Sequence, residues 1–355
     1  MSPTGKVLIV GPSWVGDMVM AQSLYRLLHA SRGAVEIHVV APSWSLPILA
    51  RMPEVAAGIE LPVAHGELGL GKRWALGKRL RAARYAQAIV LPRSAKAALV
   101  PWFARIPLRT GFRGEWRYGL LNDVRPLARD LEQTVKRFAA LGMEPGAPLP
   151  VPLPAPRLHV DHANRERLLK ALDVPRDPLV ALIPGAEYGP AKRWPSAYFA
   201  ELAARLAAAG AGVLILGSAK EHALGEEVRA GARSAAVVNM CGKTSLADAV
   251  DLLAAAAAAV SNDSGLMHVA AAAGTHVIAL YGSSSPRFTP PLTESQTVLY
   301  RALDCSPCFA RECPLGHLRC LHDIGVVSVL DAVLARFTPA RADFAPGAAP
   351  DGNAD

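Results

Sequence analysis

The chain of 355 residues has no apolar run of the length that crosses a membrane. Its longest uncharged apolar stretch runs from Leu252 to Val260, whereas a membrane-spanning helix needs ~20 such residues. We also expect no secretion signal, because Lys6 leads directly into an apolar run and a glycine turn. Hydrophobic residues make up 51% and charged residues 19% of the chain, which is typical of a globular protein with room for two domains. We therefore expect a soluble, cytosolic protein.

Cysteine is scarce, and its distribution is uneven. Four of the five cysteines fall in one short segment: Cys305, Cys308, Cys313 and Cys320. Disulfides are rare in the cytosol, so this segment raises the hypothesis of a structural zinc site or a reactive dithiol. The spacing fits the usual two-pair zinc pattern poorly, so a segment without metal is the alternative.

A dinucleotide-binding fingerprint is missing after the first strand-like run. The turn Gly11–Asp17 does not have the spacing G-x-G-x-x-G, which argues against an NAD-dependent oxidoreductase. Asp17 stands where the next helix should begin. One interpretation is a helix cap, which aspartate often provides. The other is a general base whose carboxylate is kept ionised by the helix N-terminus.

Negative charge is scarce in the first 150 residues, which hold 20 Lys/Arg against 10 Asp/Glu, whereas residues 151–355 hold 18 against 20. A basic half indicates an anionic partner: nucleic acid, a membrane surface or an acidic substrate. No recognisable nucleic-acid-binding motif interleaves with these side chains, and a solvated helix face is the simple alternative for 72–84. Much of the excess lies in Lys72, Arg73, Lys78, Arg79, Arg81, Arg84, Arg93, Lys96, Arg105, Arg109, Arg113 and Arg117.

Short apolar strands alternate with helical patterns, which predicts βαβ units and doubly wound parallel sheets of the α/β class. Helices are expected over Met18–His29 and from Pro195 to Gly210, because proline commonly opens a helix and glycine closes it. The predicted strands are Lys6–Val10, Val35–Val40, Ala88–Leu91, Leu179–Ile183, Val213–Gly217, Ala236–Asn239, Ala259–Val260 and His276–Tyr281.

A proline-rich stretch between Met143 and Arg157 divides the chain, since it can hold neither a helix nor a central strand. We expect two Rossmann-like domains facing across a cleft, the first over residues 1–155 and the second over 156–337. The tail over 338–355 is rich in Ala, Pro and Gly, and it is expected to be disordered.

The segment Val260–His268 carries the strongest functional signal. A strand ends there and turns through small polar residues into an Ala-rich helix, and the N–H groups at such a helix start suit a phosphate. Asp263 offers an acceptor for sugar hydroxyls, and His268 offers a donor for phosphate oxygens. A second polar turn, Pro184–Pro195, carries Lys192, which could neutralise a leaving diphosphate. Together the two turns predict a nucleotide-diphosphate pocket; a surface lysine and a buried helix histidine are the alternatives.

Four stretches resemble the bacterial lipopolysaccharide heptosyltransferases, glycosyltransferase family 9. They are Gly11–Met18, Arg109–Asp123, Pro184–Pro195 and Asn262–Ala272. They stand in the expected order, and the resemblance extends over nearly the whole chain except the linker and the tail. It is most specific to the members that add the second heptose of the inner core. Members that add the first heptose, and other core enzymes of the family, are the alternatives.

The resemblance implies a GT-B fold, in which two Rossmann-like domains enclose the active site. It implies an ADP-heptose donor held by the second domain and an anionic lipopolysaccharide inner-core acceptor, with inversion at the anomeric carbon. No cofactor is expected for the chemistry, and the chain has no D-x-D pair to hold a divalent metal. The acceptor's phosphates and acidic sugars would account for the basic half, which also favours peripheral association with the inner face of the inner membrane.

Residue by residue, Asp17 matches the proposed catalytic base of the family. The acceptor-binding candidates come from the arginine-rich stretch and are Arg109, Arg113 and Arg117. The donor-binding candidates combine the matching residues with glutamates and a glycine near polar turns: Lys192, Asp263, Ser264, Gly265, His268, Glu187, Glu221 and Gly185.

Overall fold

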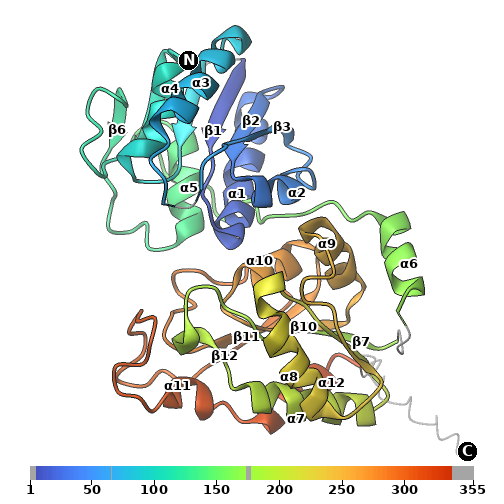
Figure 1. Cartoon of the computed structure of the whole chain (residues 1–355). Coiled ribbons are helices and arrows are strands. Elements are labelled where there is room, and N and C mark those ends of the chain that lie inside the picture. Colours follow the sequence, from blue (N-terminus) through green and yellow to red (C-terminus); the bar gives the residue numbers. More distant parts are fainter. Residues whose placement is uncertain (1–4, 65, 173–176, 338–355) are drawn as a thin grey trace, which may run out of the picture.

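The computed structural model describes residues 5–64, 66–172 and 177–337. Within these residues it contains two parallel six-stranded sheets, one in each of two domains that lie one above the other (Figure 1). The predicted α/β class with two doubly wound parallel sheets is confirmed. The tail that was expected to be disordered lies outside the described residues, and the exact domain boundaries stay predictions.

The first sheet has the strand order β3-β2-β1-β4-β5-β6. Its strands are β1 (Lys6–Val10), β2 (Glu36–Ala41), β3 (Val55–Glu60), β4 (Gln87–Val90), β5 (Leu108–Phe112) and β6 (Asp123–Arg125). Its helices are α1 (Val15–Arg32), α2 (Leu46–Leu49), α3 (Leu70–Leu80), α4 (Leu99–Phe103) and α5 (Thr134–Gly142). The order reverses between β1 and β4, and such a switch point opens a crevice at the carboxyl ends of the strands.

The second sheet has the order β12-β11-β10-β7-β8-β9, so its switch point lies between β10 and β7. Its strands are β7 (Leu179–Ile183), β8 (Gly212–Ile215), β9 (Val237–Asn239), β10 (Ala258–Asn262), β11 (His276–Tyr281) and β12 (Gln296–Tyr300). The helices of this half are α6 (His162–Lys170), α7 (Ser196–Ala208), α8 (His222–Ala232), α9 (Leu246–Ala255), α10 (Gly265–Ala272), α11 (Arg319–His322) and α12 (Val326–Leu334).

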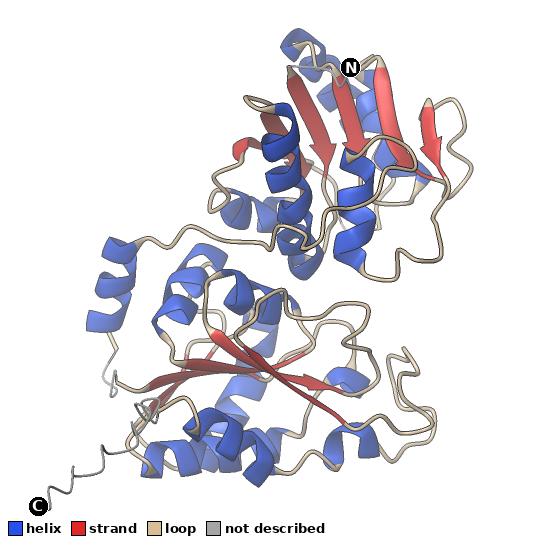
Figure 2. Ribbon diagram, turned by 180° about the vertical axis from the view of Figure 1, so that it is seen from behind, coloured by secondary structure: helices blue, strands red, loops and turns tan. Residues whose placement is uncertain are grey.

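Central strands read as continuous apolar runs because helices cover both of their faces (Figure 2). All eight predicted strands appear within a few residues of their expected bounds, as do the helices now seen as α1 and α7. The sequence analysis missed β3, β5, β6 and β12. Three of them, β3, β6 and β12, are edge strands that are only partly buried, and β5 is interrupted by Arg109 and Gly111, so none of the four shows a continuous apolar run.

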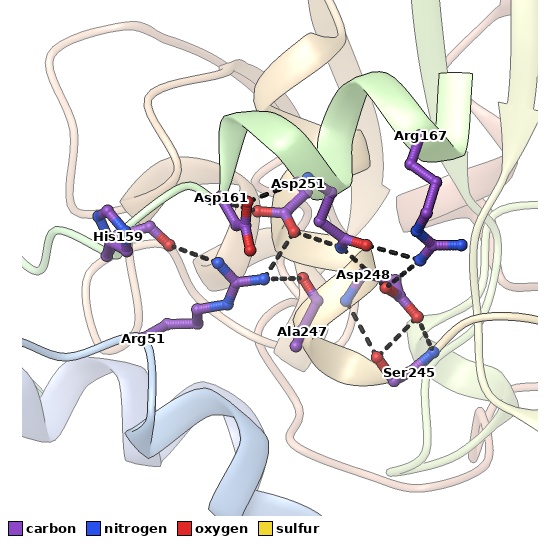
Figure 3. Close-up of polar contacts among 9 residues, drawn as sticks. Arg51, His159, Asp161, Arg167, Ser245, Ala247, Asp248 and Asp251 are labelled. Carbon is purple, nitrogen blue, oxygen red and sulfur yellow. Dashed lines mark hydrogen bonds and ion pairs between the residues drawn. The ribbon is translucent and has the colours of Figure 1, made fainter. Parts of the chain in front are cut away.

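A buried carboxylate joins the two domains beside the end of the linker. Asp251, on α9, is fully buried, and its oxygens accept hydrogen bonds from the Arg51 guanidinium of the first domain (2.6 Å), the backbone N–H of Asp161 (2.8 Å) and the Asn164 amide (2.7 Å). Figure 3 shows how this network continues through Asp248. It fastens the start of α6 and the first domain to one point on the second domain.

The linker is also bound to the first domain. Arg157 exchanges two hydrogen bonds with the Gln22 side chain of α1, at 2.9 and 2.7 Å, while the Leu158 N–H donates to the Ala272 carbonyl of the second domain (2.9 Å). The linker end is therefore tied to both domains. Among the described residues no helix has the length and apolarity needed to pass through a bilayer.

Candidate active site

Two strand–turn–helix units, one from each domain, meet at the switch points of the two sheets. The first helix turn of α1, after β1, packs against the first turn of α10, after β10. Glycines permit this approach: a Cβ on Gly16 would lie 2.7 Å from Cδ2 of His268 and 3.3 Å from Cα of Gly265. Two helix N-termini, each with a partial positive charge, thus converge on one place.

Asp17 enters this meeting point from the first turn of α1. Burial, and next the neighbouring Asp263 carboxylate, raise the pKa of Asp17 to about 6, while the Lys192 ammonium opposes the rise. The N-cap position of α1 is occupied by Trp14, and Asp17 is the third residue of the helix. Asp17 is therefore not the N-cap residue. A carboxylate with a pKa near neutrality is suited to taking a proton from an alcohol.

Lys192 and Asp263 form an ion pair on the opposite wall of the site. The Lys192 Nζ lies 2.5 Å from Asp263 Oδ2, and both side chains are largely buried. Thr289, which the sequence analysis missed, contacts the other Asp263 oxygen at 3.5 Å. Because a carboxylate already balances it, Lys192 would have to exchange this partner for a diphosphate when a nucleotide binds.

His268 lies one turn inside α10 and is almost fully buried. Burial lowers the pKa of His268 to about 4, the Lys192 charge adds to this effect, and Asp263 opposes it. Its Nδ1 has no hydrogen-bond partner among the described residues. A neutral histidine with an unused polar atom is available to a ligand, and an orphaned buried polar atom is costly unless something fills that role.

The start of α10 offers polar groups to a ligand. Ser264 occupies its N-cap position without a side-chain cap hydrogen bond, and its hydroxyl lies 3.2 Å from that of Ser261. Gly265 brings no side chain of its own to the first turn, and a Cβ there would lie 3.2 Å from the Cβ of Val15 on α1. Backbone N–H groups at a helix start bind phosphate oxygens.

Asn262 holds the polar turns of the second domain in register, a role that the sequence analysis missed. It is fully buried at the end of β10. Its side chain accepts a hydrogen bond from the Trp194 N–H (2.9 Å) and donates one to the Pro184 carbonyl (2.8 Å). Three segments that are distant in the sequence are thereby fixed at one sheet edge, which positions Lys192 beside Asp263.

The two glutamate candidates lie at the same edge but differ in their contacts. Glu221 packs over Gly185, where a Cβ would lie only 1.6 Å from Glu221 Oε1, so this glycine makes room for the carboxylate. Its other oxygen accepts the Ser218 N–H at 2.7 Å. Glu187 is more exposed and pairs with Lys220 at 2.9 Å. Glu221 is therefore held in place, and Glu187 is free to move with its lysine.

The arginine candidates separate into two groups. Arg109 lies near the amino end of β5, away from the cleft, and donates to the carbonyls of Ile106 and Leu120 at 2.6 Å each. Arg117 is buried and donates to the carbonyls of Phe112 and Pro92. Their guanidinium groups bind the protein's own backbone, and their contact with the acceptor stays a prediction.

Arg113 is the exception, because it is exposed at the carboxyl end of β5. It lines a cavity of about 590 Å³ together with Arg93, Ser94 and Glu115. Gly114 forms part of the wall, where a Cβ would lie 2.1 Å from the Arg93 carbonyl oxygen. The cavity opens on the same sheet edge as Asp17, and it is the basic part of the first domain that faces the site.

The four clustered cysteines carry free thiols, as does the buried Cys241. Burial raises the pKa of Cys320, and the other three thiols of its segment raise it further, so these sulfurs are close in space. Within the described ranges, however, no three His, Cys, Asp or Glu side chains are arranged to hold a metal ion.

Taken together, one domain presents an acidic group suited to proton abstraction and the other presents a lysine, a helix start and a neutral histidine suited to a diphosphate. Two Rossmann-like domains with this division of roles define a glycosyltransferase with the GT-B fold. The protein class expected from the sequence is thus the one that fold and site define.

Comparisons with known proteins agree with this class. The sequence profile of glycosyltransferase family 9 (heptosyltransferase) matches residues 73–319. The chain is 49% identical over 304 residues to lipopolysaccharide heptosyltransferase 2 of Salmonella typhimurium, covering 83% of this chain and 87% of that protein. The solved structure of the Escherichia coli ADP-heptose LPS heptosyltransferase II superposes with a TM-score of 0.84 at 45% identity, covering 94% and 98% of the two chains. Lipopolysaccharide heptosyltransferase 1 of Pseudomonas aeruginosa is 34% identical over 175 residues, which is 44% of this chain and 48% of that protein. The chain belongs to glycosyltransferase family 9, the heptosyltransferases.

Proposed function

We propose that the protein transfers L-glycero-D-manno-heptose from ADP-heptose to the first heptose of the lipopolysaccharide inner core, the reaction of a heptosyltransferase II. Similarity to relatives of that name supports the substrates. The observation that carries the mechanism is Asp17, whose pKa is raised to about 6 at the place where α1 meets the Lys192–Asp263 pair.

The reaction is a single displacement with inversion. The acceptor hydroxyl gives its proton to the Asp17 carboxylate while its oxygen attacks the anomeric carbon of the donor. The bond from that carbon to the diphosphate oxygen breaks on the opposite face, and ADP leaves with the electron pair. Negative charge that develops on the diphosphate is stabilised by fixed positive groups: Lys192 and the N-terminus of α10. A divalent metal has no necessary part in these steps.

On the donor side, His268 and the Ser264–Gly265 turn are proposed to contact the diphosphate together with Lys192. The neutral imidazole of His268 donates a hydrogen bond without adding a full charge. Glu221, held by Ser218 above Gly185, is positioned for the ribose hydroxyls, and Glu187 is proposed for the sugar. Asp263, released from Lys192, accepts from a donor hydroxyl.

On the acceptor side, the cavity lined by Arg93 and Arg113 is proposed to hold an anionic group of the inner core, such as a phosphate or a sugar carboxylate. Arg113 is one of the three arginines expected from the sequence to bind the acceptor, and it lines this cavity. Binding the acceptor close to Asp17, with the two domains around it, keeps water from attacking the donor in place of the sugar.

Two further expectations remain proposals. The first is peripheral association with the inner face of the inner membrane, which the basic first domain favours. The second is a structural zinc at the four clustered cysteines. Mass spectrometry of the folded, desalted protein tests it: a mass equal to that of the bare chain rejects the zinc.

The function itself is tested by incubating the purified protein with ADP-heptose and acceptors that carry no heptose or one heptose. We expect the mass of one heptose to be added only to the acceptor that already carries one. Addition to the heptose-free acceptor instead would assign the first transfer, as in the heptosyltransferase 1 relatives. No addition to either acceptor, from a protein that binds ADP, would reject both.

A further inference from the structure

The outer flank of the first domain exposes large apolar side chains. Leu70 and Trp74 on α3 are 52% and 48% exposed, and Trp102 on α4 is 45% exposed. The two tryptophans line one groove of about 570 Å³, and α3 and α4 pack side by side at the end of the domain away from the second sheet (Figure 1). Grouped exposed apolar side chains of this size mark a binding surface more often than chance exposure does.

Basic side chains share this flank. Between Glu67 and Glu115 the chain contains eleven Lys/Arg and no Asp or Glu, and two of these, Lys78 and Arg79, are exposed on α3 as Trp74 is. Lys78 stacks its ammonium over the Trp74 ring at 4.5 Å, and Arg81 and Arg105 line the groove between the tryptophans. Cations placed beside indole rings suit a partner that offers negative charge next to apolar material, which is the chemistry of an anionic lipid headgroup layer.

The flank lies apart from the catalytic cleft. Leu76 and Leu80 of α3 pack on Leu8 and Val100 in one apolar cluster, whereas α1 contributes to a different cluster on the opposite face of the sheet. A partner on this flank therefore leaves the meeting point of α1 and α10 open to both substrates.

We propose that the aromatic-basic face, formed by Leu70, Trp74, Lys78, Arg79, Trp102 and Arg105, docks the protein on an anionic lipid bilayer. The indole rings lie at the level of the headgroups, and the basic side chains contact lipid phosphates. The inference names the surface for the peripheral association put forward under the proposed function.

Vesicle sedimentation tests the face without any catalytic step. The full-length protein is mixed with vesicles of equal parts phosphatidylglycerol and phosphatidylcholine, or of phosphatidylcholine alone. We expect binding to the anionic vesicles only, weakened by salt. Trp74→Ala with Trp102→Ala, and separately Lys78→Glu with Arg79→Glu, should each lower the partition coefficient by about tenfold or more. All four positions are on the surface, and the melting temperature checks that each variant is folded.

Matched variants control for general loss of apolar surface or charge. Trp116 is 91% exposed in the same domain but lies outside the face, so Trp116→Ala should bind vesicles like the wild type. Arg229→Glu, on α8 of the second domain, together with Arg233→Glu, at the residue after this helix, changes the charge as much and should have little effect. Equal losses in these controls would overturn the proposal, since they would show that no particular face is used.

A second measurement separates docking from catalysis. The docking variants should transfer to a water-soluble, delipidated acceptor at the wild-type rate, but about tenfold more slowly to an acceptor embedded in anionic vesicles. If the wild type ignores anionic vesicles, the proposal is wrong whatever the enzyme's activity. If it ignores vesicles but binds duplex DNA through the same residues, the face belongs to a nucleic-acid site instead. Loss of transfer by the wild type with retained vesicle binding would reject the proposed function alone.

Discussion

The turns after β1 and β10 have the same construction but opposite electrostatics. Each leads from a buried strand through a glycine into a helix, and each supplies an aspartate, Asp17 or Asp263. Asp263 has a lysine 2.5 Å away. Asp17 has no such cation in contact, and burial beside Asp263 raises its pKa to about 6.

In the proposed roles, one supersecondary unit serves two kinds of chemistry. A carboxyl whose pKa is raised by burial holds a proton more readily and can exchange it near neutral pH, whereas a carboxylate in contact with a cation is suited to binding. Lys192 is in contact with Asp263 and lowers the pKa of Asp17 only from a distance. Variants at Asp17, Lys192 and Gly16 change the two turns one at a time.

The largest effect is expected for Asp17→Asn. The amide has nearly the same shape but cannot take a proton, so kcat should fall by about 10³-fold or more, while ADP affinity should stay near that of the wild type. Kinetics with titration calorimetry measure both. Residual kcat above a few per cent would remove Asp17 from the role of base.

The same variant should be more stable than the wild type at high pH. A carboxyl whose pKa is raised in the folded state loses folding stability as the pH rises from 3.8 towards 6, and the penalty is constant above that. It amounts to at most about 3 kcal/mol. Thermal unfolding at pH 8 and pH 4 should show the gain for Asp17→Asn at pH 8 only. Asp263→Asn, its matched control, should be less stable because it leaves Lys192 unpaired.

Lys192→Met should have the next largest effect. It removes the positive group proposed to face the leaving diphosphate, so we expect kcat to drop by about 10²-fold, with weaker ADP binding. Arg193→Met is a suitable control, because Arg193 is its sequence neighbour and its side chain donates to the Ala186 carbonyl and not to Asp263. Comparable losses in both variants would indicate a folding effect and not a contact to the diphosphate.

Gly16→Ala should cost about tenfold in kcat/KM, because a methyl group 2.7 Å from the His268 ring forces the two helix starts apart. Gly71→Ala adds the same group to α3, where nothing outside the helix's own backbone lies within 4 Å. This variant should have the kcat/KM of the wild type. If Gly16→Ala has wild-type kinetics, the close contact between the two turns is not needed for transfer.

The smallest effect concerns the pH profile. If Asp17 is the base, its ionised form is the active one, so kcat/KM should fall as the pH drops below about 6. Lys192 holds the pKa of Asp17 down, so in Lys192→Met the acidic limb should move to higher pH. A limb that stays in place would mean that another group controls it.

Sequence reasoning found the central strands and the two polar turns that the fold brings together, because both have local signals: apolar runs, glycines and polar residues at strand ends. It could not find β6, which is three residues long, or the edge strand β12, whose burial is only partial. The sequence does not distinguish Arg109 from Arg113, because they are the same residue type in one short stretch. Only the fold shows that one faces its own backbone carbonyls and the other a cavity. The contacts of Asn262 and Thr289 were not predicted, because their partners are far away in the chain.

The linker end has a mechanical consequence for turnover. Arg157 and Leu158 are bonded to opposite domains, and Asp251 adds an ion pair across the seam. Each such bond contributes about 1 kcal/mol. Together they oppose a large hinge opening of the first domain away from the second. We expect ADP to escape through a slight rocking of the lobes, with the bending absorbed upstream, between residues 143 and 154.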